Sequence, residues 1–196
     1  MNKKIYITGG IGATGHGEAF GAAYDLPNMS AYCETCASIA NVYWNYRLFL
    51  RHGHAKYFDV LERTLYNAFL SGVSLEGDAF FYPNPLQSQG QHARSPWFSC
   101  ACCPGNVTRF VPSVPGYFYA QKEKSIYVNL FGQSETDVVV NDTKVNLKQV
   151  TNYPWEDFLT ERYQQVFSKA GFGARAGFGK RPAVIVVDVN YNFTGD

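Results

Sequence analysis

Two short cysteine clusters constrain the fold of this chain more than any other feature of its sequence. All five cysteines lie in Cys33-Glu-Thr-Cys36 and Cys100-Ala-Cys-Cys103. Thiols gathered at two points, with a carboxylate between the first pair, indicate a metal site or a reactive thiol. The fold must then bring together two segments that are far apart in the sequence.

The composition favours a packed globular protein. The chain has 196 residues, is 46% hydrophobic and 16% aromatic, and carries a formal net charge of +1. It has no run of like charges, so nothing in it indicates binding to nucleic acid or to a membrane surface. It also lacks a stretch of membrane-span length and the apolar core of a signal peptide. We therefore expect a cytoplasmic protein, whose clustered cysteines more often bind metal or catalyse than form disulfides.

A glycine-rich segment near the N-terminus resembles a nucleotide-binding loop only formally. Residues 10–15 match the dinucleotide fingerprint and follow a short apolar stretch. A Rossmann loop opens directly into a helix, and an apolar strand ending in an acid follows. Here Pro27 comes too early for such a helix, and that strand is missing. An NAD(P)-dependent oxidoreductase is therefore kept only as an alternative, and a loop that presents His16 and Glu18, or a plain surface loop, fits better.

Hydrophobic periodicity predicts helices first and short strands later. Apolar residues at helical spacing predict a helix from residue 39 to Gly53 and a second over 57–70, joined as an antiparallel pair. Residues 73–82 predict a β-hairpin, and Pro104 predicts the start of a short helix with Cys103 extended before it. Strands of a sandwich or meander are expected at 117–120, 125–131, 137–140 and 144–148.

The C-terminal part of the sequence changes in character. A charged stretch over 157–169 predicts a helix, and the unbroken apolar run over 183–189 is typical of a central parallel strand. A central strand needs neighbours on both sides, and the sequence ends soon after this run. We therefore expect the rest of this second fold to be missing.

Glu34, Cys36, Cys102 and Cys103 supply one carboxylate and three thiolates, which match a tetrahedral zinc site. Residues two apart face the same side of an extended segment but not of a helix. If Glu34 and Cys36 bind one ion, the chain must be extended or irregular there, with a helix starting just after. A redox pair at Cys33 and Cys36, or buried structural thiols, are alternatives. Spacing alone does not distinguish a structural metal from a catalytic one.

Several motifs follow one another over about residues 4–155. They are Gly9-Gly-Ile-Gly12, His16-Gly-Glu18, Tyr24-Asp-Leu-Pro-Asn28, Glu34-Thr-Cys-Ala-Ser-Ile-Ala40, Asp59-Val-Leu-Glu-Arg-Thr-Leu-Tyr-Asn67, Leu70-Ser-Gly-Val-Ser74 and Cys102-Cys-Pro104. Together they resemble glycoside hydrolase family 127, the zinc-dependent retaining β-L-arabinofuranosidases of bacteria.

The resemblance implies roles for individual residues. Cys102 would be the nucleophile and Glu18 the acid/base, while Glu34, Cys36 and Cys103 would hold zinc together with the Cys102 sulfur. Zinc would keep the nucleophile deprotonated, and Cys102 would form a thioglycosyl intermediate as the acid/base protonates the departing alcohol and later activates water. The implied partner is an arabinose-containing glycan or glycoside. His16 is a further candidate for substrate binding.

The implied fold is of the α+β class. Residues 1–116 would be helices of a partial (α/α)6 barrel, 117–155 the start of a β-sandwich, and 156–196 a foreign αβ tail. Family members are much longer, so we expect most of the barrel to be absent, which leaves open whether this chain is active by itself. A zinc-binding remnant without enzymatic activity is the alternative from a different class.

The tail carries a resemblance of its own. The sequence Gly177-Phe-Gly-Lys-Arg-Pro-Ala-Val-Ile-Val-Val-Asp-Val-Asn-Tyr-Asn-Phe193 resembles the start of isochorismatase-like cysteine hydrolases, near the N-carbamoylsarcosine amidase type. The resemblance makes Asp188 the match to the catalytic aspartate at the carboxyl end of a strand. The lysine and nucleophilic cysteine expected downstream do not follow in this sequence, so amidohydrolase chemistry is not expected from the chain.

Overall fold

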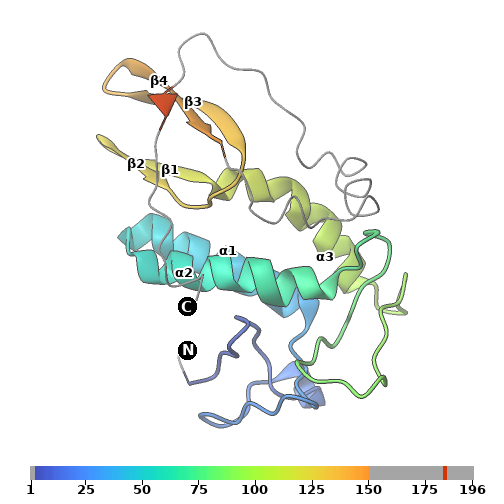
Figure 1. Cartoon of the computed structure of the whole chain (residues 1–196). Helices are drawn as coiled ribbons and strands as arrows, with labels where there is room; N and C mark the ends of the chain where they lie inside the picture. Colours follow the sequence, from blue (N-terminus) through green and yellow to red (C-terminus); the bar gives the residue numbers. More distant parts are fainter. Residues whose placement is uncertain (1–2, 151–182, 185–196) are drawn as a thin grey trace, which may run out of the picture. The chain divides into compact units, whose positions relative to one another are not determined.

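The computed structural model describes residues 3–150 and 183–184, and the chain divides into two compact units, Met1–Tyr117 and Phe118–Asp196 (Figure 1). The described part of the first unit contains helices and long loops, and that of the second contains short strands. This mixture of helices and small antiparallel sheets agrees with the expected α+β class. The barrel, the domain assignments and the foreign tail stay predictions.

Seven helical elements are described in the first unit. They are the 3-10 turn η1 (His16–Glu18), α1 (Thr35–His52), α2 (Ala55–Arg63), the π-helix η2 (Thr64–Phe69), and then η3 (Leu70–Gly72), α3 (Cys102–Phe110) and η4 (Val111–Tyr117). Within the described residues, no helix is long and apolar enough to cross a membrane.

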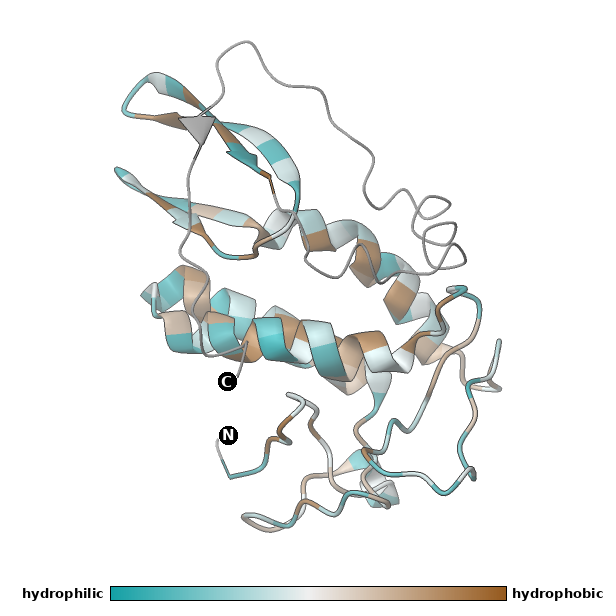
Figure 2. Cartoon of the chain, in the orientation of Figure 1, coloured by the Kyte–Doolittle hydropathy of each residue, from teal (hydrophilic) through white to brown (hydrophobic). Residues whose placement is uncertain are grey.

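Helix α1 is the central element of the first unit, and it packs against α2, η2 and α3. Its buried residues include Ile39, Val42 and Phe49, which recur at helical spacing. Figure 2 shows the resulting alternation of apolar and polar residues along the helices. The helix ends where the sequence predicted, because Gly53 adopts a left-handed conformation with φ of 69° and its N–H donates to the Phe49 carbonyl at 2.7 Å.

The second predicted helix is divided into three helical elements. It begins at Ala55 and changes into the π-helix η2 at Thr64. The Thr64 hydroxyl donates to the Val60 carbonyl at 2.7 Å and also lies 3.2 Å from the Gly9 carbonyl. A threonine that bonds back to the preceding turn disturbs the regular ladder, which accounts for the irregular helix here.

Aromatic side chains pack where the helices meet. Phe110 of α3 is fully buried, with its ring centroid 4.6 Å from that of Phe69 and 5.5 Å from that of Tyr43, both in edge-to-face geometry. Phe49 of α1 packs edge-to-face on Phe58 of α2 at 5.2 Å. The contacts of Phe110 attach α3 to α1 and η2, and the Phe49–Phe58 pair attaches α2 to α1.

Helix α3 begins earlier than predicted. Ala101 is its N-cap residue, so Cys102 and Cys103 form the first turn, and the expectation that Cys103 is extended before Pro104 is wrong. The proline is accommodated because backbone N–H groups in the first helical turn have no partner inside the helix. After Phe110 the chain continues as the 3-10 helix η4, which contains Pro115.

The predicted hairpin over 73–82 is reduced to one bridge between Val73 and Phe80. That bridge has two bonds: the Ser74 N–H donates to the Ala79 carbonyl at 2.8 Å, and the Phe81 N–H donates to the Gly72 carbonyl at 2.9 Å. The pairing goes no further because the Phe81 carbonyl accepts from the Thr35 hydroxyl at 2.7 Å. A hairpin ladder cannot extend through groups that are already paired.

Two antiparallel strand pairs make up most of the described part of the second unit. They are β1 (Tyr119–Lys122) with β2 (Ser125–Val128), and β3 (Ser134–Val140) with β4 (Thr143–Gln149). Asn141 and Asp142 join β3 to β4 with φ of 48° and 61°, the left-handed pair of a type I′ turn. The short strand β5 (Ala183–Val184) pairs with β4 in parallel.

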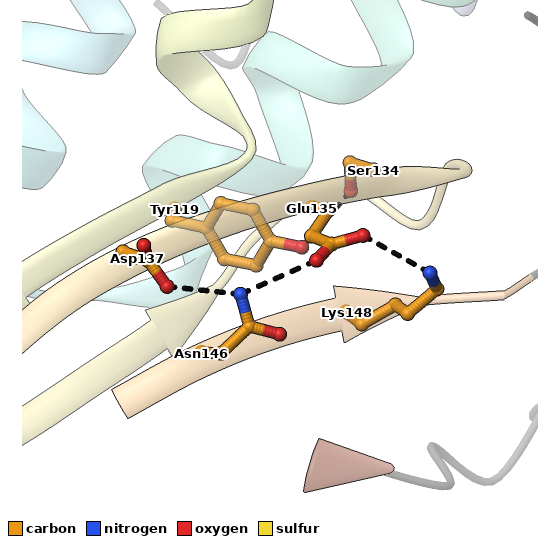
Figure 3. A network of polar contacts seen from close by, with 6 residues as sticks. All are labelled: Tyr119, Ser134, Glu135, Asp137, Asn146 and Lys148. Carbon is orange, nitrogen blue, oxygen red and sulfur yellow. Dashed lines mark hydrogen bonds and ion pairs between the residues drawn. The ribbon is translucent and has the colours of Figure 1, made fainter. Parts of the chain in front are cut away.

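Figure 3 shows the polar network that links β3 to β4. Glu135 accepts from the Lys148 ammonium at 3.0 Å and from the Asn146 amide at 3.4 Å, and the same amide donates to Asp137 at 2.9 Å. The Tyr119 hydroxyl of β1 lies 2.9 Å from the Ser134 hydroxyl. In this network each carboxylate meets a cationic or amide donor.

Most of the predicted tail lies outside the described residues. Only Ala183 and Val184 of the apolar run over 183–189 are described, as β5. The predicted helix over 157–169 and the candidate Asp188 lie outside. The resemblance to isochorismatase-like hydrolases therefore stays a prediction.

Candidate metal and catalytic site

The first cysteine cluster, Cys33 to Cys36, begins at a sharp turn that precedes α1. Cys33 has φ of 39°, and its backbone N–H donates to the Gly12 carbonyl at 2.9 Å. Glu34 follows as the non-helical N-cap residue of α1, with φ of −49° and ψ of 138°. The backbone is therefore irregular at Glu34, as predicted, but the helix starts at Thr35, so that Cys36 lies in its first turn rather than before it.

The second cluster occupies the first turn of α3, and the packing of α3 against α1 brings the clusters together. One ligand atom from each of Glu34, Cys36, Cys102 and Cys103 lies within 4.8 Å of all the others. Glu34 and Cys103 are buried, and the other two are half-buried. The cysteines lie near two helix N-termini, where negative charge is favoured.

Four of the six separations within this group, which we name the Glu/Cys cluster, lie near those expected between the ligands of a tetrahedral zinc ion. Zinc–sulfur bonds of about 2.3 Å and zinc–oxygen bonds of about 2.0 Å place tetrahedral ligands about 3.8 Å (S to S) and 3.5 Å (S to O) apart. The Cys103 sulfur lies 3.4 Å from that of Cys36 and 3.8 Å from that of Cys102. Glu34 Oε1 lies 3.3 Å from the Cys102 sulfur and 3.7 Å from the Cys103 sulfur. The donor set and its spacing therefore fit a zinc ion.

The thiols of the cluster differ in acidity. The pKa of Cys36 is lowered, first by its hydrogen bond with the Cys103 thiol, whereas that same bond and burial raise the pKa of Cys103. Burial raises the pKa of Cys102 to about 11. In the protein without metal, Cys36 is therefore the first of the three to ionise. A divalent cation would favour the thiolate form of all three.

Asn106 is a neighbour of the cluster that the sequence analysis missed. Its side-chain amide donates to the Cys36 sulfur at 3.1 Å. A signal was available, because residues three and four apart share a helix face and Asn106 follows Cys103 and Cys102 by those spacings.

Two tyrosines contact the candidate acid/base, and one of them also contacts the cluster. Glu18 ends the turn η1 with φ of 50°, and its Oε1 accepts from the Tyr32 hydroxyl at 3.0 Å and lies 3.5 Å from the Tyr82 hydroxyl. The pKa of Tyr82 is raised, first by its hydrogen bond to the Cys102 thiol. Tyr82 therefore contacts both predicted catalytic residues. Neither tyrosine could be predicted from the sequence, since no sequence spacing relates them to Glu18.

The remaining candidates lie apart from the four donors. His16 is exposed, and its backbone N–H donates to the Thr14 hydroxyl at 3.1 Å. Cys100 is exposed, and Cys33 is buried, which raises the pKa of its thiol to about 12. Neither cysteine belongs to the Glu/Cys cluster. A role for His16 in substrate binding stays a prediction.

The glycine-rich loop packs against α1 and η2 and does not open into the helix that a nucleotide-binding loop needs. It leads into the three-residue turn η1, and the next described helix starts only at Thr35. Gly9 has φ of 85°, and a Cβ there would collide with Thr64. The Gly9 carbonyl accepts from the buried Asn41 amide at 3.1 Å. The loop thus attaches the segment that carries Glu18 to α1 and η2.

The chain is similar to known proteins in sequence and in fold. Residues 1–116 match the family described as "Beta-L-arabinofuranosidase, GH127 catalytic domain". The non-reducing end β-L-arabinofuranosidase of Bifidobacterium longum subsp. longum is 32% identical over 169 residues, which cover 80% of this chain and 25% of that protein.

Two solved structures extend the comparison. A GH127 β-arabinofuranosidase is 66% identical with a TM-score of 0.76, covering 78% of this chain and 24% of that one. A GH127 β-L-arabinofuranosidase from Geobacillus stearothermophilus T6 is 42% identical with a TM-score of 0.74, covering 78% and 26%. The chain thus spans about a quarter of the length of these relatives. Since the family match covers residues 1–116 of 196, the chain belongs to glycoside hydrolase family 127.

Proposed function

We propose that this chain carries the zinc ligands and catalytic groups of a retaining β-L-arabinofuranosidase. The observation that carries the proposal is the convergence of Glu34, Cys36, Cys102 and Cys103 within 4.8 Å. Its named relatives are β-arabinofuranosidases, which supports an arabinofuranoside as the substrate. Zinc held by these four residues would keep the Cys102 sulfur in its thiolate form at neutral pH.

The first step would use Cys102 and Glu18. The Cys102 thiolate attacks the anomeric carbon, so that a carbon–sulfur bond forms as the glycosidic carbon–oxygen bond breaks. The Glu18 carboxyl group gives its proton to the departing oxygen. The hydroxyl groups of Tyr32 and Tyr82 lie 3.0 Å and 3.5 Å from Glu18 Oε1 and would orient the carboxyl group for this transfer.

The second step would release the sugar. Glu18, now a carboxylate, removes a proton from a water molecule as the water oxygen attacks the anomeric carbon. The carbon–sulfur bond breaks, and Cys102 returns to its thiolate form. Two displacements at the same carbon retain its configuration, and water is the only co-reactant.

The test combines zinc content and turnover in three proteins. The parent, Cys102→Ala and the matched control Cys33→Ala are purified as monodisperse samples. Cys33 is a suitable control because it lies outside the cluster. We expect about one zinc per chain in the parent and the control. Hydrolysis of an aryl β-L-arabinofuranoside is expected in both and should be lost in Cys102→Ala.

Two results would contradict parts of this proposal. A parent protein without zinc would overturn the metal site. Bound zinc without any turnover would overturn the catalytic roles and leave a zinc-binding protein.

A further inference from the structure

Asn106 makes a contact with the Glu/Cys cluster that none of the proposed catalytic steps uses. Its amide nitrogen lies 3.1 Å from the Cys36 sulfur, a distance at which an N–H group donates to sulfur. The opposite orientation would place the amide oxygen against an electron-rich sulfur, which is unfavourable. The nitrogen is therefore the atom that faces Cys36.

Asn106 lies on the same face of α3 as two of the four candidate ligands. It follows Cys103 by three residues and Cys102 by four, so α3 presents all three side chains on one face. Cys36 belongs to α1, so the Asn106 contact crosses from one helix to the other. It fixes the position of the Cys36 sulfur relative to the two sulfurs of α3.

The Asn106 contact also offsets negative charge on the Cys36 thiolate. A carboxylate and three thiolates bring four negative charges to a divalent ion, so the ligands outweigh the metal. An N–H donor withdraws electron density from the thiolate it contacts. Asn106 donates to Cys36 from a neutral side chain that is not itself a candidate ligand, as the Tyr82 hydroxyl does to Cys102.

We propose that Asn106 is a positioning residue of the metal site, whose amide holds and partly neutralises the Cys36 sulfur so that the four ligands fit one ion. This inference rests on the proposed function, because it needs the ion to be bound by the cluster. Hydrogen-bonding partners of metal ligands commonly change metal affinity or activity by about 10-fold to 100-fold when they are removed.

The experiment measures metal binding rather than turnover. Zinc affinity is measured by competition with a chromogenic chelator, and the sulfur-to-metal charge-transfer absorption is recorded with cobalt(II) in place of zinc. Asn106→Leu keeps the approximate volume but removes the donor, Asn106→Ala removes it without steric strain, and Asn106→Gln retains an amide. Asn67→Leu is the matched control, since Asn67 is an exposed helical asparagine whose amide donates to the Arg63 carbonyl at 2.8 Å.

We expect zinc affinity to fall by about 10-fold in the leucine and alanine variants, and by less in the glutamine variant. The cobalt absorption should shift in the first two and stay unchanged in Asn67→Leu. If Asn106 only supports packing, its loss would lower the melting temperature and leave the cobalt spectrum and zinc affinity unchanged, which would overturn the inference. A parent that binds no metal would overturn the proposed function itself, so the two failures are distinguishable.

Discussion

Each unit of the chain contains a dense polar cluster, and the two clusters differ in what contacts their carboxylates. In the second unit, the Glu135 carboxylate accepts from the Lys148 ammonium at 3.0 Å. In the first unit, the Glu34 carboxylate lies against the Cys102 and Cys103 thiols. An ammonium compensates a carboxylate, whereas a thiol that ionises adds to its charge. The β3–β4 network thus contains its own compensating cation, whereas the Glu/Cys cluster would be stabilised by a bound cation.

The clusters also differ in how the chain assembles them. Glu135 and Lys148 face each other directly across the antiparallel register of β3 and β4, so a short hairpin is enough. The Glu/Cys cluster joins two pairs of residues from distant parts of the sequence, and Cys36 and Cys103, for example, are 67 positions apart. It therefore depends on the packing of α1 against α3. Ordering distant segments so that thiols meet beside a carboxylate costs chain entropy. A bound ligand explains this arrangement better than a contribution to the stability of the fold does.

The largest effect should come from removing a buried ligand. Cys103→Ala is expected to reduce zinc content from about one per chain toward zero, because three remaining donors leave the tetrahedral site incomplete. The matched control is Cys33→Ala, which changes another buried cysteine that lies outside the cluster. Zinc content is measured by elemental analysis. Equal zinc content in the two variants would mean that the Glu/Cys cluster does not hold the ion.

The next effect concerns the pH dependence of thiol alkylation in protein stripped of metal. Only the thiolate reacts, so a thiol with a lowered pKa reacts at lower pH and one with a raised pKa needs higher pH. Cys36 should therefore react at lower pH than Cys102, whose pKa is raised to about 11. Peptide mass spectrometry after brief iodoacetamide treatment follows each site. Adding zinc should protect both, and a lower reaction midpoint at Cys102 would contradict the assignment.

The sequence predicted the features of the first unit that depend on local patterns. The end of α1 follows from Gly53, whose left-handed conformation closes the helix. The four donors could be named because cysteine and glutamate are metal ligands by type. The start of α3 was mispredicted, because a proline in the first turn is compatible with a helix that begins two residues earlier, at Cys102.

Contacts made across the fold could not be predicted in this way. Tyr82 meets Glu18 only because the loop after η3 returns to α1, where Thr35 binds the Phe81 carbonyl. That bond also limits the predicted hairpin to one bridge. No periodicity in the sequence reports such a return, since it depends on which backbone groups find partners in three dimensions.

A third prediction tests a polar contact that contains no charge. The buried Asn41 amide donates to the Gly9 carbonyl and to the Thr64 hydroxyl, both at 3.1 Å. Asn41→Leu leaves buried polar groups without this donor and should lower the free energy of unfolding by about 2–3 kcal/mol. Asn67→Leu, which removes an exposed amide, should cost much less. Urea denaturation measures both, and equal losses would contradict a special role for the buried contact.

The smallest expected effect tests the charge-compensated network of the second unit (Figure 3). The Lys148 and Glu135 side chains are only 9% and 15% exposed, whereas those of the second pair, Lys144 and Asp137, are 70% and 46% exposed. Lys148→Met removes the ammonium that lies 3.0 Å from Glu135 and should cost about 1–2 kcal/mol, less than for a fully buried pair. Lys144→Met should leave the unfolding midpoint unchanged, because water already solvates that pair.

The double variant Glu135→Leu with Lys148→Met completes this comparison. It removes both charges, so it should recover much of the stability that Lys148→Met loses. Such recovery would show that the network serves stability alone and can be replaced by apolar packing. The Glu/Cys cluster should behave in the opposite way, because replacing Glu34 and Cys103 together by apolar residues removes ligands and cannot restore zinc binding. Zinc binding that survived this double replacement would remove the distinction between the two clusters.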